Sequence, residues 1–190
     1  MSSNRYLELL SCSNPNEVYQ KAREFSSDRP ENEHLTRSTI LDIHANVETK
    51  LKQVLYQHML GILFQDDNET ENKKRKKSLE KTITRLSFMD VYRLLKPCLD
   101  AFPAPDFASI EHINSVRNQV THAGSMEKVI YKGRNPYKAP DSLAQLFLDS
   151  WAVCEELTHF YQTMIADPRG IAEHYAKFYS EHYKDLQLEE

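Results

Sequence analysis

Residues 35–64, LTRSTILDIHANVETKLKQVLYQHMLGILF, carry the longest unbroken helical pattern in this chain of 190 residues. Apolar residues recur there at steps of three and four, so they fall on one face of an α-helix. We therefore expect a central helix from about Leu35 to Phe64. Alternating runs typical of strands are scarce in the rest of the chain, so the sequence predicts an all-α fold. The inward stripe of the central helix should comprise Ile40, Ile43, Val47, Leu51, Val54 and Leu55.

Shorter helices are expected on either side of this segment. Residues 1–33 are interpreted as an N-terminal extension with helices at about 5–10 and 17–25, separated by a turn. After the central helix, residues 65–77 change from acidic to basic, QDDNETENKKRKK, and we expect a loop between helices there. Its lysine-rich run, residues 73–77, is either a phosphate-binding patch or a solvated entry to the next helix.

After residue 77 we expect a short helix at about 79–86, followed by a second helix with an N-terminal cap. Ser87 and Asp90 have the spacing of a capping box, so a helix should begin there and run to about residue 99. Pro97 is expected to bend or end it, because proline removes a backbone donor and crowds the preceding turn.

Two aspartates precede the remaining helices. Asp106 can cap a helix that follows it, and Asp141 can cap a long helix at about 142–166. A last helix at about 171–185 shows an aromatic stripe, which suits packing or a dimer contact.

The composition limits the classes of function. A net charge of −4 argues against a generally basic nucleic-acid coat, so any polyanion must be held by a local patch. Cys12, Cys98 and Cys154 are odd in number and far apart, which favours free thiols in a reducing compartment. No signal peptide opens the chain and no apolar run approaches membrane-spanning length, so we expect a cytoplasmic protein without membrane contact.

The segment INSVRNQVTHAG, residues 113–124, carries the most informative polar pattern. It predicts an amphipathic helix whose polar residues, at about 100° per residue, fan across the face opposite the apolar one. Gly124 stands where a helix often ends in a left-handed residue, which puts His122 in the last turn. The apolar face consists of Ile110, Ile113, Val116 and Val120, and the polar fan of Asn114, Arg117, Asn118, Thr121 and His122.

The pair Arg117 and His122 is selected by its context. An Arg followed by a His within a few residues occurs four times in this chain, so the spacing alone has little weight. This pair alone combines a helix, a polar residue after the Arg and a small-residue exit after the His. A titratable imidazole beside a permanent cation suits acid–base work on an anion. The alternative is structural, because Arg forms salt bridges there and the helix dipole favours His at a C-terminus.

With this context, VRNQVTH at residues 116–122 resembles the signature of the HEPN superfamily (higher eukaryotes and prokaryotes nucleotide-binding). That signature is an Arg, then Asn, Asp or another polar residue, then a His near the end of a late bundle helix. The resemblance extends more loosely to an up-and-down helical bundle over residues 34–166, leaving 1–33 and 167–190 as additional N- and C-terminal helical segments. It implies a metal-independent endoribonuclease without a cofactor, dimerising so that two motifs form one composite active site.

The resemblance also implies a role for each motif residue. RNA carries its own nucleophile, the 2′-hydroxyl, and His122 can remove that proton or protonate the departing 5′-oxygen. Arg117 can hold the phosphate bidentately as charge builds up, and Asn118 can orient the imidazole or the phosphate. A two-fold homodimer that places His122 beside its symmetry mate would supply both acid and base. The expected products are a 2′,3′-cyclic phosphate and a 5′-hydroxyl, with no metal required.

Further residues are expected to support this pair. Glu48 on the central helix can pair with Arg117 or orient His122, and Arg37 on the same helix can add a phosphate contact. Asn114 and Thr121 complete the polar fan.

The segment MEKVIYKGRNPYKAP, residues 126–140, places cations between aromatic residues. This arrangement suits single-stranded RNA, which offers phosphates and exposed base faces; an ordinary solvated loop is the alternative. The candidate RNA contacts are Lys128, Tyr131, Lys132, Arg134, Tyr137 and Lys138.

Three functions follow as hypotheses. The first is an RNA-cleaving toxin or antiphage effector, with an antitoxin or another defence partner. Superfamily toxins silenced by a nucleotidyltransferase resemble one another in a Tyr two positions after the motif His. Gly124 stands there in this chain, which puts that form of regulation in doubt. The second is a non-catalytic HEPN-like module that binds RNA, a nucleotide or a protein partner, and the third is a purely structural bundle.

Overall fold

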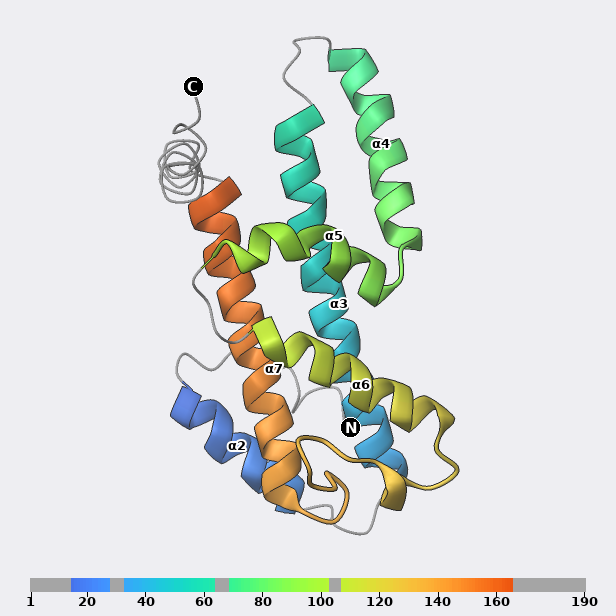
Figure 1. Cartoon of the computed structure of the whole chain (residues 1–190), viewed down its shortest axis with the longest axis vertical. Coiled ribbons are helices and arrows are strands. Elements are labelled where there is room, and N and C mark those ends of the chain that lie inside the picture. The colour runs from blue at the N-terminus through green and yellow to red at the C-terminus, as the bar shows by residue number, and fades with distance from the viewer. Residues whose placement is uncertain (1–14, 28–32, 64–68, 103–106, 166–190) are drawn as a thin grey trace, which may run out of the picture. The chain divides into compact units, whose positions relative to one another are not determined.

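A computed structural model describes residues 15–27, 33–63, 69–102 and 107–165 of the chain (Figure 1). Over these residues the fold is all-α, as predicted, and the only strand-like pairing is an isolated bridge. None of the helices in these ranges is long and apolar enough to pass through a membrane. The helices are α2 (Pro15–Ser27), α3 (Glu33–Leu63), α4 (Glu69–Arg85), α5 (Phe88–Asp100), α6 (Ala108–His122) and α7 (Pro140–Phe160), with a short 3-10 helix η2 (Met126–Lys128) and a π-helical turn η3 (Tyr161–Ile165).

The chain forms two compact units, each built from separate stretches of sequence. Within the described residues, unit 1 comprises 15–27, 33–50 and 107–156, and unit 2 comprises 51–63, 69–102 and 157–165. Helices α3 and α7 contribute residues to both units. The expected division at about residues 33 and 166 stays a prediction, because residues 28–32 and 166–190 lie outside the described ones. The helices expected at residues 5–10 and 171–185, the cap expected at Asp106 and the thiol of Cys12 lie outside the described residues.

The core of unit 1 is formed by α3, α6 and α7. Helix α3 contacts α6 through hydrogen bonds at two levels, and it approaches α7 where the Asn46 amide lies 3.7 Å from the Cys154 sulfur. The apolar stripe predicted for the central helix is confirmed, as is that of the polar-fan helix, because each side chain is buried. The buried residues include Ile40, Ile43 and Val47 of α3, Ile110, Ile113, Val116 and Val120 of α6, and Leu143, Leu146, Phe147 and Val153 of α7.

The core of unit 2 combines α5 with the second half of α3 and the end of α7. Phe102 packs edge-on against Phe160, with ring centroids 5.6 Å apart. The capping box predicted at the start of α5 is present, since Ser87 and Asp90 exchange hydrogen bonds between side chain and backbone. Pro97 does not end the helix, which continues to Asp100. The buried apolar residues here are Leu51, Val54, Leu55, Ile83, Phe88, Val91, Tyr92, Leu95, Leu99, Phe102, Leu157 and Phe160.

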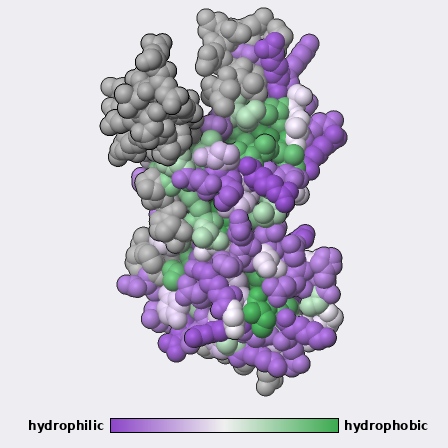
Figure 2. Space-filling model, viewed as in Figure 1, coloured by the Kyte–Doolittle hydropathy of each residue, from purple (hydrophilic) through white to green (hydrophobic). Residues whose placement is uncertain are grey.

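Helix α4 corrects the expected loop at residues 65–77. The helix begins at Glu69, so the lysine-rich run lies on a regular helix. Glu and Lys have high helix propensity, and acidic residues in a first turn complement the helix dipole. The change from acidic to basic residues thus follows the polarity of a helix. The side chains along the right-hand edge of α4 are strongly hydrophilic (Figure 2).

The connection from α6 to α7 is held by hydrogen bonds. Tyr131 and Arg134 pair through both backbone groups, and the two residues between them have positive φ, 45° at Lys132 and 82° at Gly133. Two successive positive φ values are the signature of a type I′ turn, and Gly133 suits the second position. Just beyond, the Asn135 side chain binds four backbone groups, those of Met126, Glu127, Tyr137 and Lys138.

Candidate functional site

Helix α6 presents a polar face with graded exposure. It ends at His122 as predicted, and Asn118, Thr121 and His122 are exposed, while Asn114 and Arg117 are half-buried. The Thr121 hydroxyl donates to the Arg117 carbonyl at 2.9 Å. This local bond ties the threonine to its own helix.

The end of α6 is fixed in a way that the sequence reasoning missed. Gly124 does not adopt a left-handed conformation, and the chain leaves the helix with Ala123 extended at φ −75° and ψ 131°. The Arg37 guanidinium supplies the cap instead, since its Nη1 donates to the Val120 carbonyl and its Nη2 to the Ala123 carbonyl at 3.2 Å. A permanent cation at a helix C-terminus also complements the dipole.

Glu33 extends this cap to the segment after α6. One of its carboxylate oxygens lies 3.4 Å from Arg37 Nη2 and accepts the Met126 backbone N–H at 2.8 Å. The first five residues of α3 therefore hold both the last turn of α6 and the start of η2. Arg37 was expected to contact a phosphate; the structure places its guanidinium on backbone carbonyls next to His122.

Arg117 lies beside a buried histidine of α3. His44 is 6% exposed, its Nε2 is 3.4 Å from Asn114 Oδ1, and its Nδ1 is 3.7 Å from Glu48 Oε2. Burial lowers the pKa of His44, the Asn114 bond and the Glu48 charge oppose that shift, and the Arg117 charge adds to it. His44 is therefore neutral near pH 7.

This cluster of Asn114, Arg117, Glu48 and His44 joins α3 to the polar face of α6. Glu48 was expected to act on Arg117 or His122, and the structure puts its carboxylate against His44. The Arg117 guanidinium also donates to Asn118 Oδ1 at 3.1 Å. Sequence reasoning passed over His44, although a signal was present. Position 44 follows Ile40 by four residues and precedes Val47 by three, so a polar ring falls on the apolar stripe facing α6.

The segment after α6 contains an inward-facing tyrosine. Tyr131 is 2% exposed, and its hydroxyl donates to the Asp149 carboxylate of α7. Burial, the Asp149 hydrogen bond and the Asp149 charge all raise the pKa of this phenol. The Lys132 ammonium lies 2.7 Å from the same carboxylate and 3.3 Å from the Ser109 hydroxyl. The expected stacking of Tyr131 on a nucleobase is therefore corrected, because its ring is inside the unit.

The other candidate RNA contacts remain at the surface. Lys128 and Arg134 are exposed and Tyr137 is half-buried. The Lys138 ammonium pairs with the Glu127 carboxylate at 3.1 Å, with both side chains more than half exposed. Such exposed pairs contribute little free energy and exchange readily for another anion.

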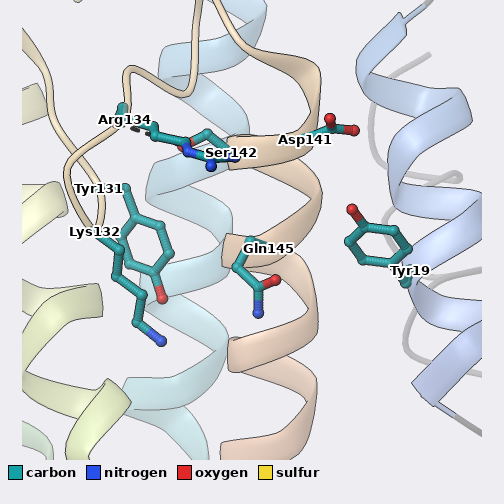
Figure 3. A pocket seen from close by; sticks show the side chains of 7 residues that line it. All are labelled: Tyr19, Tyr131, Lys132, Arg134, Asp141, Ser142 and Gln145. Atoms are coloured by element: carbon teal, nitrogen blue, oxygen red, sulfur yellow. Dashed lines mark hydrogen bonds between the residues drawn. The ribbon is translucent and has the colours of Figure 1, made fainter.

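A polar pocket of about 360 Å³ opens between the turn, α2 and the start of α7. Figure 3 shows Gln145 of α7 in the middle of this pocket, with the turn on one side and Tyr19 on the other. None of the polar-fan residues of α6 lines it. The lining residues are Tyr19, Tyr131, Lys132, Arg134, Asp141, Ser142 and Gln145.

Asp141 does not act as the expected cap. Helix α7 begins with Pro140, and Asp141 pairs at 3.0 Å with Arg23 of α2. Proline suits a first helical position because its missing N–H needs no partner there. Within the described ranges, no three His, Cys, Asp or Glu side chains gather as a metal site would require.

Comparison with family models, with curated proteins and with solved structures found no match to this chain. The resemblance of VRNQVTH to the HEPN signature therefore depends on the motif and on its placement at the end of a helix.

Proposed function

We propose that this chain is a metal-independent, HEPN-type endoribonuclease, acting as a toxin or antiphage effector. The observation that carries the proposal is the position of the motif. Arg117 is half-buried beside the His44 cluster, and His122 is exposed on the last residue of the same helix. Cleavage of a phosphodiester needs a cation that is held in place beside the phosphate and an imidazole that the substrate can reach.

The proposed reaction uses the ribose as the nucleophile. A base removes the 2′-hydroxyl proton, the 2′-oxygen attacks phosphorus, and the bond from phosphorus to the 5′-oxygen breaks. An acid returns a proton to that 5′-oxygen. The products are a 2′,3′-cyclic phosphate and a 5′-hydroxyl, and Arg117 stabilises the charge on the phosphate oxygens in between.

A homodimer completes the proposed site. One imidazole cannot conveniently act as base and acid in the same step, and a two-fold axis near His122 would bring in a second one. Among the residues that the structure describes, none hydrogen-bonds the His122 ring. The imidazole is therefore available to a substrate or to a second copy. The proposal places the protein in the cytoplasm, in keeping with the free thiols of Cys98 and Cys154.

The test is cleavage of a mixed RNA pool by purified wild-type protein and three variants, in buffer with EDTA. His122→Ala and Arg117→Ala should each abolish cleavage while leaving the circular dichroism spectrum and the oligomeric state unchanged. His112→Ala is the matched control, because His112 is an exposed histidine of the same helix. Equal activity of His122→Ala and the control would contradict the proposal, as would cleavage that EDTA abolishes.

A non-catalytic RNA-binding module is the second candidate. It is favoured because no residue in the described part of the chain hydrogen-bonds the His122 ring, so none orients it for proton transfer. A dimer that retards RNA in a gel without cutting it would support this function over the first.

A further inference from the structure

Helix α4 carries a charge opposite to that of the chain. Its sequence ETENKKRKKSLEKTITR contains seven Lys or Arg residues against three Glu, which gives a net charge of +4. The whole chain has a net charge of −4, so residues outside this helix sum to −8. A cationic segment on an acidic protein concentrates positive potential in one place, where a polyanion can be bound.

Five of the seven cations of α4 lie along one side of the helix. Lys73, Lys77, Lys81 and Arg85 follow one another at four-residue steps, so each is displaced by only about 40° from the last. Lys74 falls within the same arc. We call these five residues the cationic stripe; all are exposed, and the stripe spans about 18 Å along the helix axis. Glu80 lies at its edge and offsets one charge.

The opposite side of α4 faces the core of unit 2. Ile83 is 5% exposed and Leu79 is half-buried, and both lie roughly 140° to 180° around the helix from the middle of the stripe. The stripe therefore lies on the side of α4 away from the buried Ile83, and the right-hand edge of α4 is hydrophilic in Figure 2.

We propose that the cationic stripe of α4 binds the phosphate backbone of RNA. The inference rests on the proposed function for the choice of polyanion, and on charge complementarity for the site itself. Like charges at three- and four-residue steps repel one another within a helix, and phosphates along a strand relieve that repulsion. An acidic membrane surface is a poorer match. Interfacial helices bury large apolar side chains in the lipid, whereas the large apolar residues of α4, Leu79 and Ile83, pack into unit 2.

The contacts proposed here position RNA without reading its sequence. Each phosphate neutralised by a lysine releases counterions, so binding weakens with salt in proportion to the number of contacts. The stripe thus contributes affinity, while the motif on α6 supplies the chemistry.

The experiment measures RNA binding at several salt concentrations, by fluorescence anisotropy with a labelled single-stranded RNA. His122→Ala is the parent protein, so that the probe is not cut. The test variant carries three further substitutions in this parent, Lys74→Gln, Lys77→Gln and Lys81→Gln. Three lost phosphate contacts should reduce the slope of log affinity against log salt by about 2 for a single strand. Raising salt from about 50 to 200 mM should then weaken the parent about 15-fold more than the triple variant.

A second triple variant controls for net charge. Lys21→Gln, Arg93→Gln and Lys96→Gln remove the same three charges from residues that pair with neighbouring carboxylates on α2 and α5; Lys21 and Arg93 are exposed and Lys96 is half-buried. This control should keep the slope of the parent. Thermal melts of the stripe variant should show no loss of stability, because its substitutions remove repulsive pairs.

The outcomes separate this proposal from the proposed function. Equal slopes for the two triple variants overturn the stripe, whether or not the wild-type protein cuts RNA. If RNA binding depends on the stripe but the wild-type protein does not cut RNA, the proposed role of the stripe is supported and the proposed nuclease function is contradicted. Stripe-dependent binding to vesicles of acidic phospholipid, without binding to RNA, overturns the proposal in favour of a membrane surface.

Discussion

Replacing Arg37 with alanine should destabilise the protein through the end of α6. The guanidinium donates to the carbonyls of Val120 and Ala123, and its side chain is 26% exposed. A hydrogen bond from a charged donor contributes about 1.5 to 3 kcal/mol when buried. Because water reaches part of this site and screens the charge, we discount each bond to about 1 kcal/mol and expect a loss of about 2 kcal/mol for the pair.

The loss should be visible in thermal unfolding and in local exchange. For a chain of this length, about 2 kcal/mol corresponds to a fall in Tm of about 4 to 8 °C. The Ala123 amide, which donates to the Gln119 carbonyl at 2.7 Å, should exchange its hydrogen faster in Arg37→Ala. Arg37→Lys should fall between wild type and Arg37→Ala, because an ammonium keeps the charge but lacks the planar fork.

The matched control is Arg93→Ala. Arg93 is 70% exposed and lies 3.7 Å from the Asp90 carboxylate, so its removal should cost less than about 0.5 kcal/mol. An Arg37→Ala variant that melts with the wild type would refute the capping role. If that variant also bound RNA with a smaller salt dependence, Arg37 would instead be the phosphate contact that the sequence suggested.

Three further predictions concern titratable groups whose pKa is shifted by burial. Because the pKa of Tyr131 is raised, its neutral form stabilises the fold below about pH 10, and that stability is lost as the pH rises further. Tyr131→Phe should remove this loss at high pH. Near neutral pH the same variant should lose about 1 to 2 kcal/mol of unfolding free energy, measured with urea, because the hydrogen bond to Asp149 is gone. Burial raises the pKa of Cys154 to about 11 from 9.0, so at pH 8 its alkylation by iodoacetamide, followed by mass spectrometry, should be about a hundredfold slower than that of an unshifted thiol; equal rates would contradict the burial. Burial lowers the pKa of His44, so its stabilising contribution is present above about pH 6.5 and is lost as the pH falls. In His44→Gln the unfolding free energy should therefore fall less steeply below about pH 6.5. The control His112→Gln, at an exposed position of α6, should leave this fall unchanged.

The elements that the sequence predicted best are those whose side chains repeat with the helix. The stripe of α3 has six apolar residues at three- and four-residue steps, and burial is the dominant force that orders such a pattern. The capping box of Ser87 and Asp90 was also predictable, because its hydrogen bonds lie within one turn.

The features that were missed depend on contacts between distant segments. Arg37 caps α6 from 83 residues away, and a sequence search for caps looks only at neighbours such as Gly124. From the sequence, Tyr131 resembles an exposed aromatic residue between two cations. In the structure its hydroxyl donates a hydrogen bond to Asp149 of α7. Local pattern carries no information on such partners.

Helix α4 was misread for a different reason. Residues 69–77 have no apolar periodicity, so a charged run resembles a loop although Glu and Lys are good helix formers. The site on α6 was predicted as a set of residues on one face, and three of the five, Asn118, Thr121 and His122, are exposed. The connection of this site to α3 through His44 was not predicted, because a single histidine on an apolar stripe is usually interpreted as a core residue.

Analysis of the RNA ends left by the wild-type protein in EDTA tests the proposed chemistry most directly. Cleavage by 2′-hydroxyl attack should leave a 2′,3′-cyclic phosphate and a 5′-hydroxyl, and His122→Ala should leave the RNA intact. A 3′-hydroxyl with a 5′-phosphate, or the same cyclic ends from His122→Ala, would contradict the role assigned to this imidazole.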